Sequence, residues 1–432
     1  MRGEKLRRLN IVGTDTYLMS AGKEVYSLDN FFGNNLFAPY SSNEEIIEID
    51  GYKLRIYTSE FWTSKQRQAS SIHEVSYRAC FKPQLPNFFI QRLTSRESVV
   101  FDPFLGRGTT IVESALNGRV SIGMDVNPLS EMLTYPRINI PRIKDIFERI
   151  DSLELDETQK ADIDLSMFYH PNTESQIVNL KGYLNNRHEN EEEDNVDKWI
   201  RMVATNRLTG HSSGFFSVYT LPPNQATTQK EQLRINEKRG QKPDYRDIKA
   251  IIKKKTLSLL KDIKSESDIN KLNVTGSKSE LITEDSRFAS KYIEEAVVDL
   301  TVTSPPFLNL VQYAKDNWLR CWFNNIDISK IEARIFIASN IDKWRYFIKT
   351  VLQQLYIVTK KGGYVAFEVG EVRNGTINLD EYVALDGISC GFQVIGILIN
   401  KQNFTKTSNI WGVDNLQKGT NTNRVVLFKK GE

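Results

Sequence analysis

The segment that most constrains the fold is a short apolar run that leads directly into a glycine-containing turn. Residues 98–102 have the pattern of a buried strand, and residues 109–117 have the pattern of a helix. Between them, Gly106 and Gly108 are separated by one residue. Glycine allows a ligand to approach the backbone closely, and the start of a helix offers unpaired N–H groups. We therefore expect a ligand site at this turn.

Strands and helices alternate along much of the remaining chain. Residues 120–125 are predicted to form a second strand, which completes a βαβ-type unit. Further strands are predicted at residues 281–283, 298–302, 363–369, 392–399 and 424–428, and helices at residues 314–323 and 344–359. This alternation predicts an α/β fold with a doubly wound, mostly parallel sheet that binds ligands at the carboxyl ends of its strands.

One long interval interrupts this alternation. It is rich in helix-forming residues and contains an acidic run at residues 189–197. A basic stretch follows at residues 227–264, with twelve Lys or Arg against five Asp or Glu. We interpret the interval as a large, mainly helical insertion. The predicted parts of the chain are an N-terminal extension of open fold at residues 1–71, an α/β domain at residues 72–137 and 277–432, and the insertion at residues 138–276.

The composition argues against several kinds of site and location. The three cysteines are widely spaced and form no CxxC pair, which argues against a disulfide framework and a zinc site. The four histidines show no metal-ligand spacing, so no metal is expected. Residues 1–10 are basic without an apolar signal region, and no later run is long and apolar enough to cross a membrane. We expect a cytoplasmic protein that does not bind membranes.

The residues around the glycine turn favour a nucleoside-like ligand. Asp125 lies seventeen residues after Gly108, at the end of the next predicted strand. A carboxylate at that place can accept hydrogen bonds from both hydroxyls of a ribose. The turn lacks the third glycine of the dinucleotide fingerprint and the Lys-Ser/Thr ending of a phosphate-binding loop. The pattern is therefore not that of a site for nucleotide phosphates.

A second motif, Ser304-Pro305-Pro306-Phe307, follows the predicted strand at residues 298–302. The two prolines fix the direction of the backbone. The turn therefore presents one hydroxyl, one main-chain carbonyl and one aromatic ring at the end of a strand. A short acidic segment, Glu284-Asp285-Ser286-Arg287, begins twenty residues before Ser304.

Together these motifs resemble those of the S-adenosylmethionine-dependent DNA methyltransferases that modify exocyclic amines. Residues 102–110 are similar to the Phe-x-Gly-x-Gly cofactor motif of that family. Residues 76–86 are similar to the segment that closes over the methionine end of the cofactor. Residues 284–287 are similar to the acidic motif whose carboxylate contacts the adenine amine. The resemblance covers about residues 72–137 and 280–429 and is strongest to the cytosine-N4 branch.

The resemblance implies S-adenosyl-L-methionine as cofactor and a Rossmann-like methyltransferase sheet. The cofactor-binding residues that it implies are Phe81, Lys82, Pro83, Asp102, Phe104, Gly106, Gly108, Thr109, Thr110, Asp125, Asn127, Asp285 and Ser286. The catalytic residues that it implies are Ser304, Pro305, Pro306 and Phe307.

The second motif suits the methylation of an amine. The exocyclic amines of cytosine and adenine are poor nucleophiles because their lone pair is delocalised into the ring. Ser304 and the Pro305 carbonyl can accept the amine hydrogens, and Phe307 can stack on a base that has been taken out of the duplex. Within the family, a serine in the first position is associated mainly with cytosine N4 and an aspartate mainly with adenine N6. Ser304 therefore favours cytosine.

The sequence also bears on other methyltransferase activities and on a role without catalysis. Methylation of cytosine C5 needs a thiolate that normally follows a proline, and none of the three cysteines follows one. Three alternatives stay open: an adenine-N6 methyltransferase, an RNA amino-methyltransferase, and a catalytically silent module that binds DNA.

The expected partner is double-stranded DNA. The basic stretch suits phosphate contacts, and residues 205–214 and 224–229 contain the Asn, Gln and Arg side chains that read base edges. We therefore expect target recognition within residues 138–276, with residues 400–423 as a second candidate. The family layout departs here, because a large insertion separates Asp125 from Asp285. The resemblance also implies a bacterial or phage origin and a cognate restriction endonuclease.

Overall fold

The predicted strands all join one sheet. The computed structural model of the chain describes residues 8–9, 43–62, 69–78, 80–155, 158–222, 227–306, 313–369, 371–372, 377–401 and 422–431. The strands of the sheet are β1 (Arg8–Leu9), β2 (Asn43–Ile49), β3 (Tyr52–Ser59), β4 (Val99–Asp102), β5 (Val120–Met124), β6 (Glu280–Ile282), β7 (Val298–Thr303), β8 (Thr359–Val369), β11 (Gln393–Lys401) and β12 (Thr422–Lys429). A separate two-stranded ladder contains β9 (Glu371–Val372) and β10 (Ile377–Asn378).

The strand order shows a doubly wound sheet. Across the sheet the order is β1-β2-β3-β11-β12-β8-β7-β4-β5-β6. The five strands from β6 to β8 are parallel, and β12 runs antiparallel between β8 and β11. From β4 the chain first adds β5 and β6 on one side and later β7 and β8 on the other. The topological switch point therefore lies between β4 and β7, where open α/β sheets bind their ligands.

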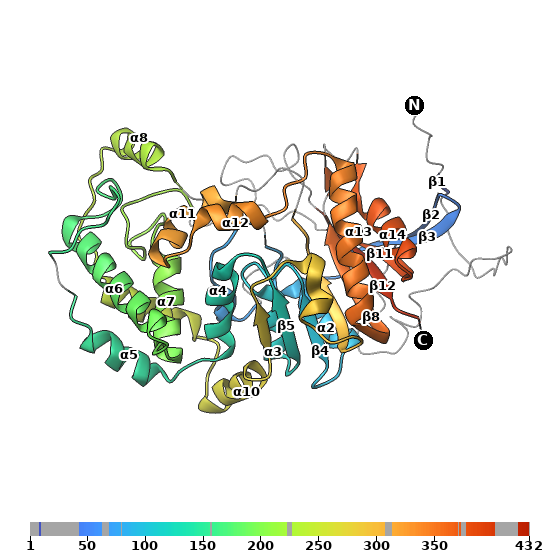
Figure 1. Ribbon diagram of the computed structural model, residues 1–432, viewed down its shortest axis with the longest axis horizontal. Coiled ribbons are helices and arrows are strands. Elements are labelled where there is room, and N and C mark those ends of the chain that lie inside the picture. Colours follow the sequence, from blue (N-terminus) through green and yellow to red (C-terminus); the bar gives the residue numbers. More distant parts are fainter. Residues whose placement is uncertain are drawn as a thin grey trace.

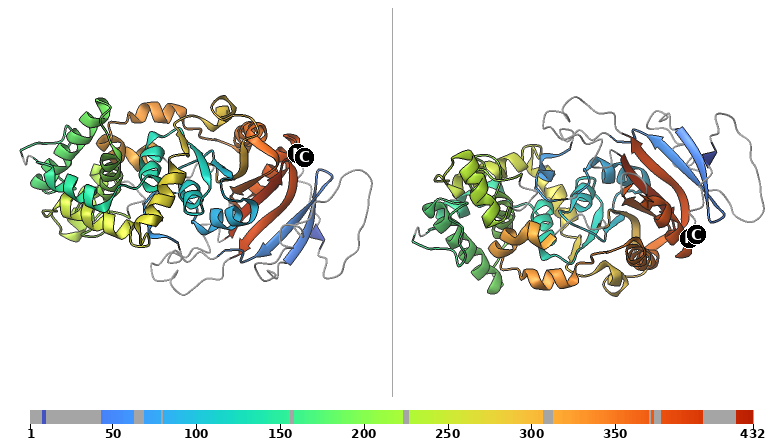
Figure 2. Two further views of the ribbon diagram at one scale, coloured as in Figure 1. Left: turned by 90° about the horizontal axis from the view of Figure 1, so that it is seen from below. Right: turned by 90° about the horizontal axis from the view of Figure 1, so that it is seen from above.

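Part of the N-terminal extension continues this sheet. The hairpin of β2 and β3 pairs through β3 with β11, in parallel. The amide of Asn400 fixes this junction, because it accepts from the Trp62 N–H and donates to the Trp62 carbonyl, at 3.2 Å each. Residues 43–59, whose fold the sequence left open, thus extend the edge of the sheet, as Figure 2 shows at the end opposite the helical lobe.

Helices cover both faces of the sheet. The helices beside it are α2 (Gln84–Leu93), α3 (Thr109–Leu116), α4 (Pro128–Ile138), the 3₁₀ helix η3 (Ser286–Lys291), α13 (Ile341–Val358) and α14 (Leu379–Ser389). Alternate residues of β4 face opposite ways: Val100 packs with α2, and Phe101 packs with α13 and α14. Both faces of the parallel strands are therefore buried, as their apolar sequences require.

The insertion folds into a helical lobe at one end of the molecule (Figure 1). Its helices are α5 (Ile143–Ser152), α6 (Pro171–Glu189), α7 (Asn195–Arg207), α8 (Gln229–Arg239), α9 (Ile248–Leu259) and α10 (Glu266–Gly276), and α11 (Tyr313–Phe323) and α12 (Ile328–Arg334) lie beside it. Its core is continuous with that of the sheet, since Ile111 of α3 and Trp199 of α7 belong to one buried cluster.

The lobe also holds the segment that precedes α2. The amide of Asn206 in α7 bonds both the N–H and the carbonyl of Ser76, at 3.1 and 3.0 Å. Asp262 accepts the Ser71 N–H at 2.8 Å, next to the short helix η2 (Ser71–His73). The insertion therefore positions residues 71–78, the segment that precedes α2, β4 and then the glycine turn.

Several polar side chains expected to read bases are used inside the protein instead. Asn206 and Arg207 are buried, and Arg207 lies over the Phe215 ring. Thr228 caps α8, and Gln229 donates to the Asp164 carbonyl. The base-reading hypothesis is therefore wrong for Asn206 and Arg207, because their polar groups are buried and bonded inside the lobe. For the exposed Gln229 it stays a prediction. Residues 224–226 lie outside the described ranges.

The basic stretch divides into two unlike parts. On α9, Lys249 donates to the Leu153 carbonyl, Lys253 pairs with Asp151, and Lys255 pairs with Glu74. On α8, Lys230, Arg234 and Lys238 are exposed, and none of them forms a salt bridge within the described residues.

In the described part of the chain, no helix is both long and apolar enough to span a bilayer. The same residues contain no cluster of three metal-binding side chains.

Candidate cofactor and active site

The glycine turn connects the end of β4 to the start of α3. Gly106 and Gly108 have positive φ angles of 51° and 73°, a conformation that costs little only for glycine. The Gly108 N–H donates to the Leu105 carbonyl at 2.6 Å, which closes the turn. A Cβ on Gly108 would overlap the side chain of Thr134 in α4. Two separate constraints therefore require glycine at position 108.

Hydrogen bonds join this turn to the end of β7. Thr303 donates its hydroxyl to the Asp102 carboxylate at 2.7 Å, and Asp102 also accepts the Phe104 N–H. From α3, Thr110 donates to the Val302 carbonyl at 3.1 Å. These contacts hold Ser304, the residue after Thr303, at the same edge of the sheet as the glycine turn.

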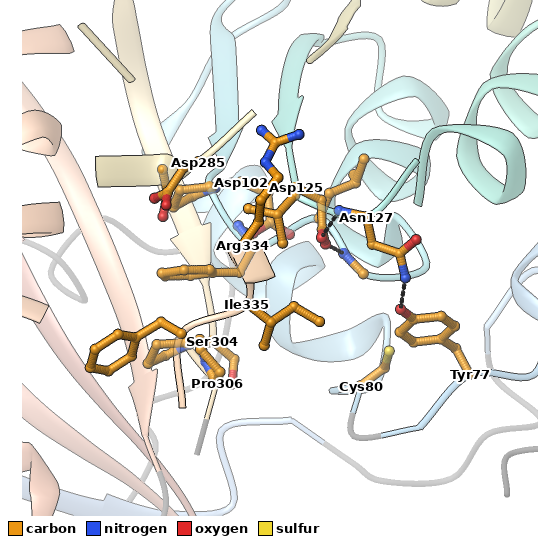
Figure 3. Close-up of a pocket in the computed structure, with 18 of the residues that line it drawn as sticks. Tyr77, Cys80, Asp102, Asp125, Asn127, Asp285, Ser304, Pro306, Arg334 and Ile335 are labelled. Carbon is orange, nitrogen blue, oxygen red and sulfur yellow. Dashed lines mark hydrogen bonds between the residues drawn. The ribbon is translucent and has the colours of Figure 1, made fainter. Parts of the chain in front are cut away.

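A cavity opens at this edge (Figure 3), and the space among its lining residues, open solvent included, is about 940 Å³. The predicted residues that line it are Phe81, Asp102, Phe104, Gly106, Thr109, Asp125, Asn127, Asp285, Ser286, Ser304, Pro305 and Pro306. Residues from both motifs therefore face one space, although they are about two hundred positions apart in the chain.

The other predicted residues have different positions. Gly108 caps α3, and Thr110 is buried behind the turn. Pro83 caps α2, and burial lowers the pKa of the neighbouring Lys82. None of these four lines the cavity. Phe307 lies outside the described residues.

Asp125 is held with its carboxylate in the cavity. One oxygen accepts the Gly106 N–H at 2.8 Å and the other accepts the Asn127 N–H at 3.0 Å. Burial raises the pKa of Asp125, while hydrogen bonds from Asn127, Gly106, Ser130 and Val126 act in the opposite direction. The carboxylate lines the cavity beside the glycine turn, which is the place that a pair of ribose hydroxyls would require.

The acidic motif forms the adjacent wall. Asp285 accepts from both the N–H and the guanidinium of Arg287, the latter at 2.6 Å. Glu284 pairs with Arg334 at 2.5 Å. The predicted contact of Asp285 with an adenine amine therefore requires Arg287 to release part of the carboxylate.

The charge of the lining disfavours phosphate groups. Four of the lining residues are acidic: Asp102, Asp125, Glu284 and Asp285. Burial raises the pKa of Asp102 to about 6, so this carboxylate is mostly ionised at neutral pH. Two of these carboxylates are in ion pairs, Glu284 with Arg334 and Asp285 with Arg287, and the other lining arginine, Arg78, pairs with Asp316. Asp102 and Asp125 form no salt bridge within the described residues, so they leave the lining acidic. A cationic or neutral nucleoside fits such a lining better than a phosphate does.

The Ser-Pro-Pro turn faces the same cavity from the end of β7. Pro305 is buried, whereas Ser304 and Pro306 are partly accessible from the cavity. The Pro306 carbonyl accepts the Trp344 indole N–H at 3.0 Å, which ties the turn to α13. The Pro305 carbonyl is thus the one that we keep as a candidate acceptor for an amine.

Sequence reasoning missed one wall of the cavity. Arg334, the last residue of α12, enters the lining with Ile335, Phe336 and Phe347 of α13. The Phe336 and Phe347 rings are stacked with centroids 4.2 Å apart. Phe347 follows the apolar period of its helix, which indicates burial but no ligand, and residues 334–336 carry no motif. Cys80 also lines the cavity, and burial raises the pKa of its thiol.

Comparison with known families gives an independent result. A family model for N6/N4-type DNA methylases matches residues 16–131, which include the glycine motif and Asp125. The resemblance to the amino-methylating DNA methyltransferases is confirmed.

The curated proteins that this chain is similar to are type II methyltransferases. M.BsoBI of Geobacillus stearothermophilus is 22% identical over 333 residues, which is 69% of this chain and 62% of the relative. M.MjaII of Methanocaldococcus jannaschii is 26% identical over 127 residues, 28% of this chain and 23% of the relative. M.MvaI of Kocuria varians is 27% identical over 128 residues, 29% of this chain and 25% of the relative. The chain thus spans less than two thirds of each relative's length.

Solved methyltransferase structures align weakly. A protein from Thermus thermophilus, described as a DNA modification methylase in complex with S-adenosyl-L-methionine, has 19% identity and a TM-score of 0.22 over 34% of this chain and 54% of its own. An rRNA methyltransferase from Streptomyces viridochromogenes has 11% identity and a TM-score of 0.34 over 85% and 93%. The α/β fold therefore rests on the strand order and register of the chain itself.

Substitution of Gly108 tests the geometry of the turn. We expect Gly108→Ala to lower the free energy of unfolding by about 1–2 kcal/mol for the left-handed backbone and by about 1–3 kcal/mol more for the overlap with Thr134. Gly118→Ala is the matched control, because Gly118 has nearly the same φ of 72° with no atom within 4 Å of an added Cβ. Urea denaturation measures both variants, and equal losses would contradict the close packing at Gly108.

Proposed function

We propose that the chain is an S-adenosylmethionine-dependent DNA methyltransferase that methylates an exocyclic amine, namely N4 of a cytosine flipped out of the duplex. The observation that carries this proposal is the shared cavity, in which Gly106 and Asp125 face the same space as Ser304. A nucleoside-type cofactor and a base can therefore be bound next to each other.

The lining fits S-adenosyl-L-methionine. Asp125 places its carboxylate where ribose hydroxyls can donate to it, and the Phe336–Phe347 pair and Ile335 offer apolar surface for the adenine. Asp102 and Asp125, which form no salt bridge within the described residues, suit a sulfonium cation and disfavour a pyrophosphate. When bound, this cofactor supplies a methyl group on positively charged sulfur.

The residues of the turn then act on the amine. The Ser304 hydroxyl and the Pro305 carbonyl accept the amine hydrogens, which draws the nitrogen lone pair out of conjugation with the ring. The Trp344 bond to the Pro306 carbonyl and the Thr303 bond to Asp102 hold the turn in place, so the nucleophile is oriented before it reacts. Phe307 is proposed to stack on the flipped base.

The base specificity is tested by the product. Tritiated methyl transfer to duplex DNA, followed by digestion and nucleoside chromatography, should give N4-methylcytosine. N6-methyladenine as the sole product would establish an adenine-N6 methyltransferase instead. That alternative stays open because a serine in the first position of the motif is associated mainly, and not always, with cytosine N4. Methylation of RNA but not of duplex DNA would establish an RNA enzyme. Absence of transfer to any nucleic acid would favour the silent DNA-binding module.

Ser304→Ala tests the catalytic assignment. Removal of the hydroxyl deletes an acceptor for the amine but no cofactor contact, so we expect kcat to fall at least about 100-fold with unchanged affinity for S-adenosylmethionine. Single-turnover transfer and equilibrium binding measure the two quantities. Normal turnover in this variant would remove Ser304 from the mechanism.

We propose further that α8 contacts the DNA backbone. Lys230, Arg234 and Lys238 are spaced four residues apart and therefore share one exposed face of the helix. In Figure 1, α8 lies on the same side of the molecule as α12, which leads into the cavity wall, whereas α10 lies on the opposite side. Within the proposed target-recognition region at residues 138–276, this role assigns the backbone contact to α8. Of the second candidate, residues 400–423, all but the two residues at each end lie outside the described ranges.

A triple substitution of these residues by alanine tests that surface. If each contacts one phosphate, the slope of log affinity against log salt should become shallower by about 2 to 3. Alanine at Lys254, Lys261 and Lys264 is the matched control, because it removes the same charge from exposed positions on α9 and between α9 and α10. If the two triple variants change the salt dependence equally, the effect comes from the net charge of the chain and not from a contact between α8 and the DNA.

A cognate restriction endonuclease, a cytoplasmic location and a bacterial or phage origin complete the proposal. The family resemblance supports them. Cleavage of unmodified DNA, in an extract of the source organism, at the site that this chain methylates would test the first of the three.

A further inference from the structure

A buried glutamate lies directly behind the Ser-Pro-Pro turn. Glu368 is in β8, next to β7, and the register pairs Thr303 with Phe367. The residues that follow, Ser304 and Glu368, are therefore neighbours at the carboxyl ends of these strands. Only 6% of Glu368 is exposed, and the opposite residue of β12 is the fully buried Val425.

Neutral side chains surround the Glu368 carboxylate in the part of the chain that the structure describes. The Asn423 amide donates to it at 3.0 Å, and the Ser304 hydroxyl, at the end of the neighbouring strand, lowers its pKa as a hydrogen-bond donor does. Burial raises the pKa of Glu368, while both hydrogen bonds favour its ionised form. Within the described residues, no Lys or Arg forms a salt bridge with this carboxylate.

Two other buried carboxylates near the sheet have a cationic partner. Asp380 is paired with Arg424 at 2.9 Å, and Asp386 is paired with Arg345 at 2.7 Å. Asp102 of the proposed active site, like Glu368, has only neutral donors within the described residues. A buried carboxylate without a cationic partner is costly, so its presence beside the reactive turn points to a role. Since one of the donors to Glu368 is the proposed catalytic hydroxyl, the geometry suggests what that role is.

We infer that Glu368 is a positioning residue for Ser304, and that it receives, through the Ser304 hydroxyl, the proton that the methylated amine releases. The inference rests on the proposed function. With its own hydrogen directed at Glu368, Ser304 Oγ turns its lone pairs toward the cavity. The hydroxyl is thereby fixed as an acceptor, as the amine requires.

The proton balance of the step is complete. The amine nitrogen uses its lone pair to form the new N–CH₃ bond, and the S–CH₃ bond breaks with its electron pair left on sulfur. The nitrogen then carries a positive charge and loses one N–H proton to Ser304 Oγ. Ser304 passes its original proton to the Glu368 carboxylate, which later releases it to solvent. Neither an oxidant nor a metal is needed.

Glu368→Gln tests the inference, because it keeps the shape of the side chain but removes the charge. We expect kcat to fall about 100-fold while the KM for DNA and the affinity for S-adenosylmethionine stay within a factor of three. Combined with Ser304→Ala, it should add little to the loss of the single variant, since both act through one hydroxyl. Asp386→Asn is the matched control: it neutralises a buried carboxylate away from the cavity and should keep the wild-type kcat.

Two further measurements keep the test decisive. Thermal denaturation and S-adenosylmethionine binding show whether the Gln variant is folded. If it is not, Glu368→Asp, whose shorter side chain withdraws from Ser304, should lose at least tenfold in kcat with normal cofactor affinity. A folded Gln or Asp variant with the wild-type kcat would overturn the inference while leaving the proposed function intact. A wild-type chain that methylates no amine would overturn the proposed function itself.

Discussion

The hydrogen bond from Thr303 to Asp102 is the contact on which the rest of the site depends. It joins residues 201 positions apart and sets the end of β7 beside the end of β4. The glycine turn begins one residue after Asp102, and the Ser-Pro-Pro turn begins one residue after Thr303. Because these strands flank the topological switch point, a single buried bond brings a ligand-binding turn and a reactive turn to one cavity.

The helical insertion serves this cavity as well as the proposed DNA contact. Its core is continuous with that of α3, and Asn206 and Asp262 hold the segment that carries Tyr77 and Arg78 into the lining. One wall of the cofactor site therefore depends on the fold of the insertion. The exposed basic face of α8, in contrast, makes no salt bridge within the described residues. The insertion thus supports the cofactor site from inside the protein and also presents a basic surface to solvent.

Local patterns predicted the seven strands from β4 to β8 and β11 to β12 that belong to the sheet, but not the edge strands β1 to β3. The motifs, interpreted through the family resemblance, predicted twelve residues that reach the cavity, because a strand–turn–helix unit determines its own geometry. Contacts set by tertiary packing could not be predicted. Residues 334–336 have no motif, Asn206 looks like a base-reading side chain until its partners at Ser76 are known, and Glu368 gains meaning only from the β7–β8 register. The basic stretch likewise divided into paired and exposed lysines only in three dimensions.

The proposal that one cavity binds S-adenosylmethionine beside a reactive turn can be tested by calorimetric titration of the intact chain. We expect one equivalent of S-adenosylmethionine to bind and S-adenosylhomocysteine to compete for the same site. ATP and NAD⁺ should not compete, because the carboxylates of the lining repel their phosphates. If the folded chain binds no S-adenosylmethionine, or binds ATP equally well, the proposed cofactor site is wrong.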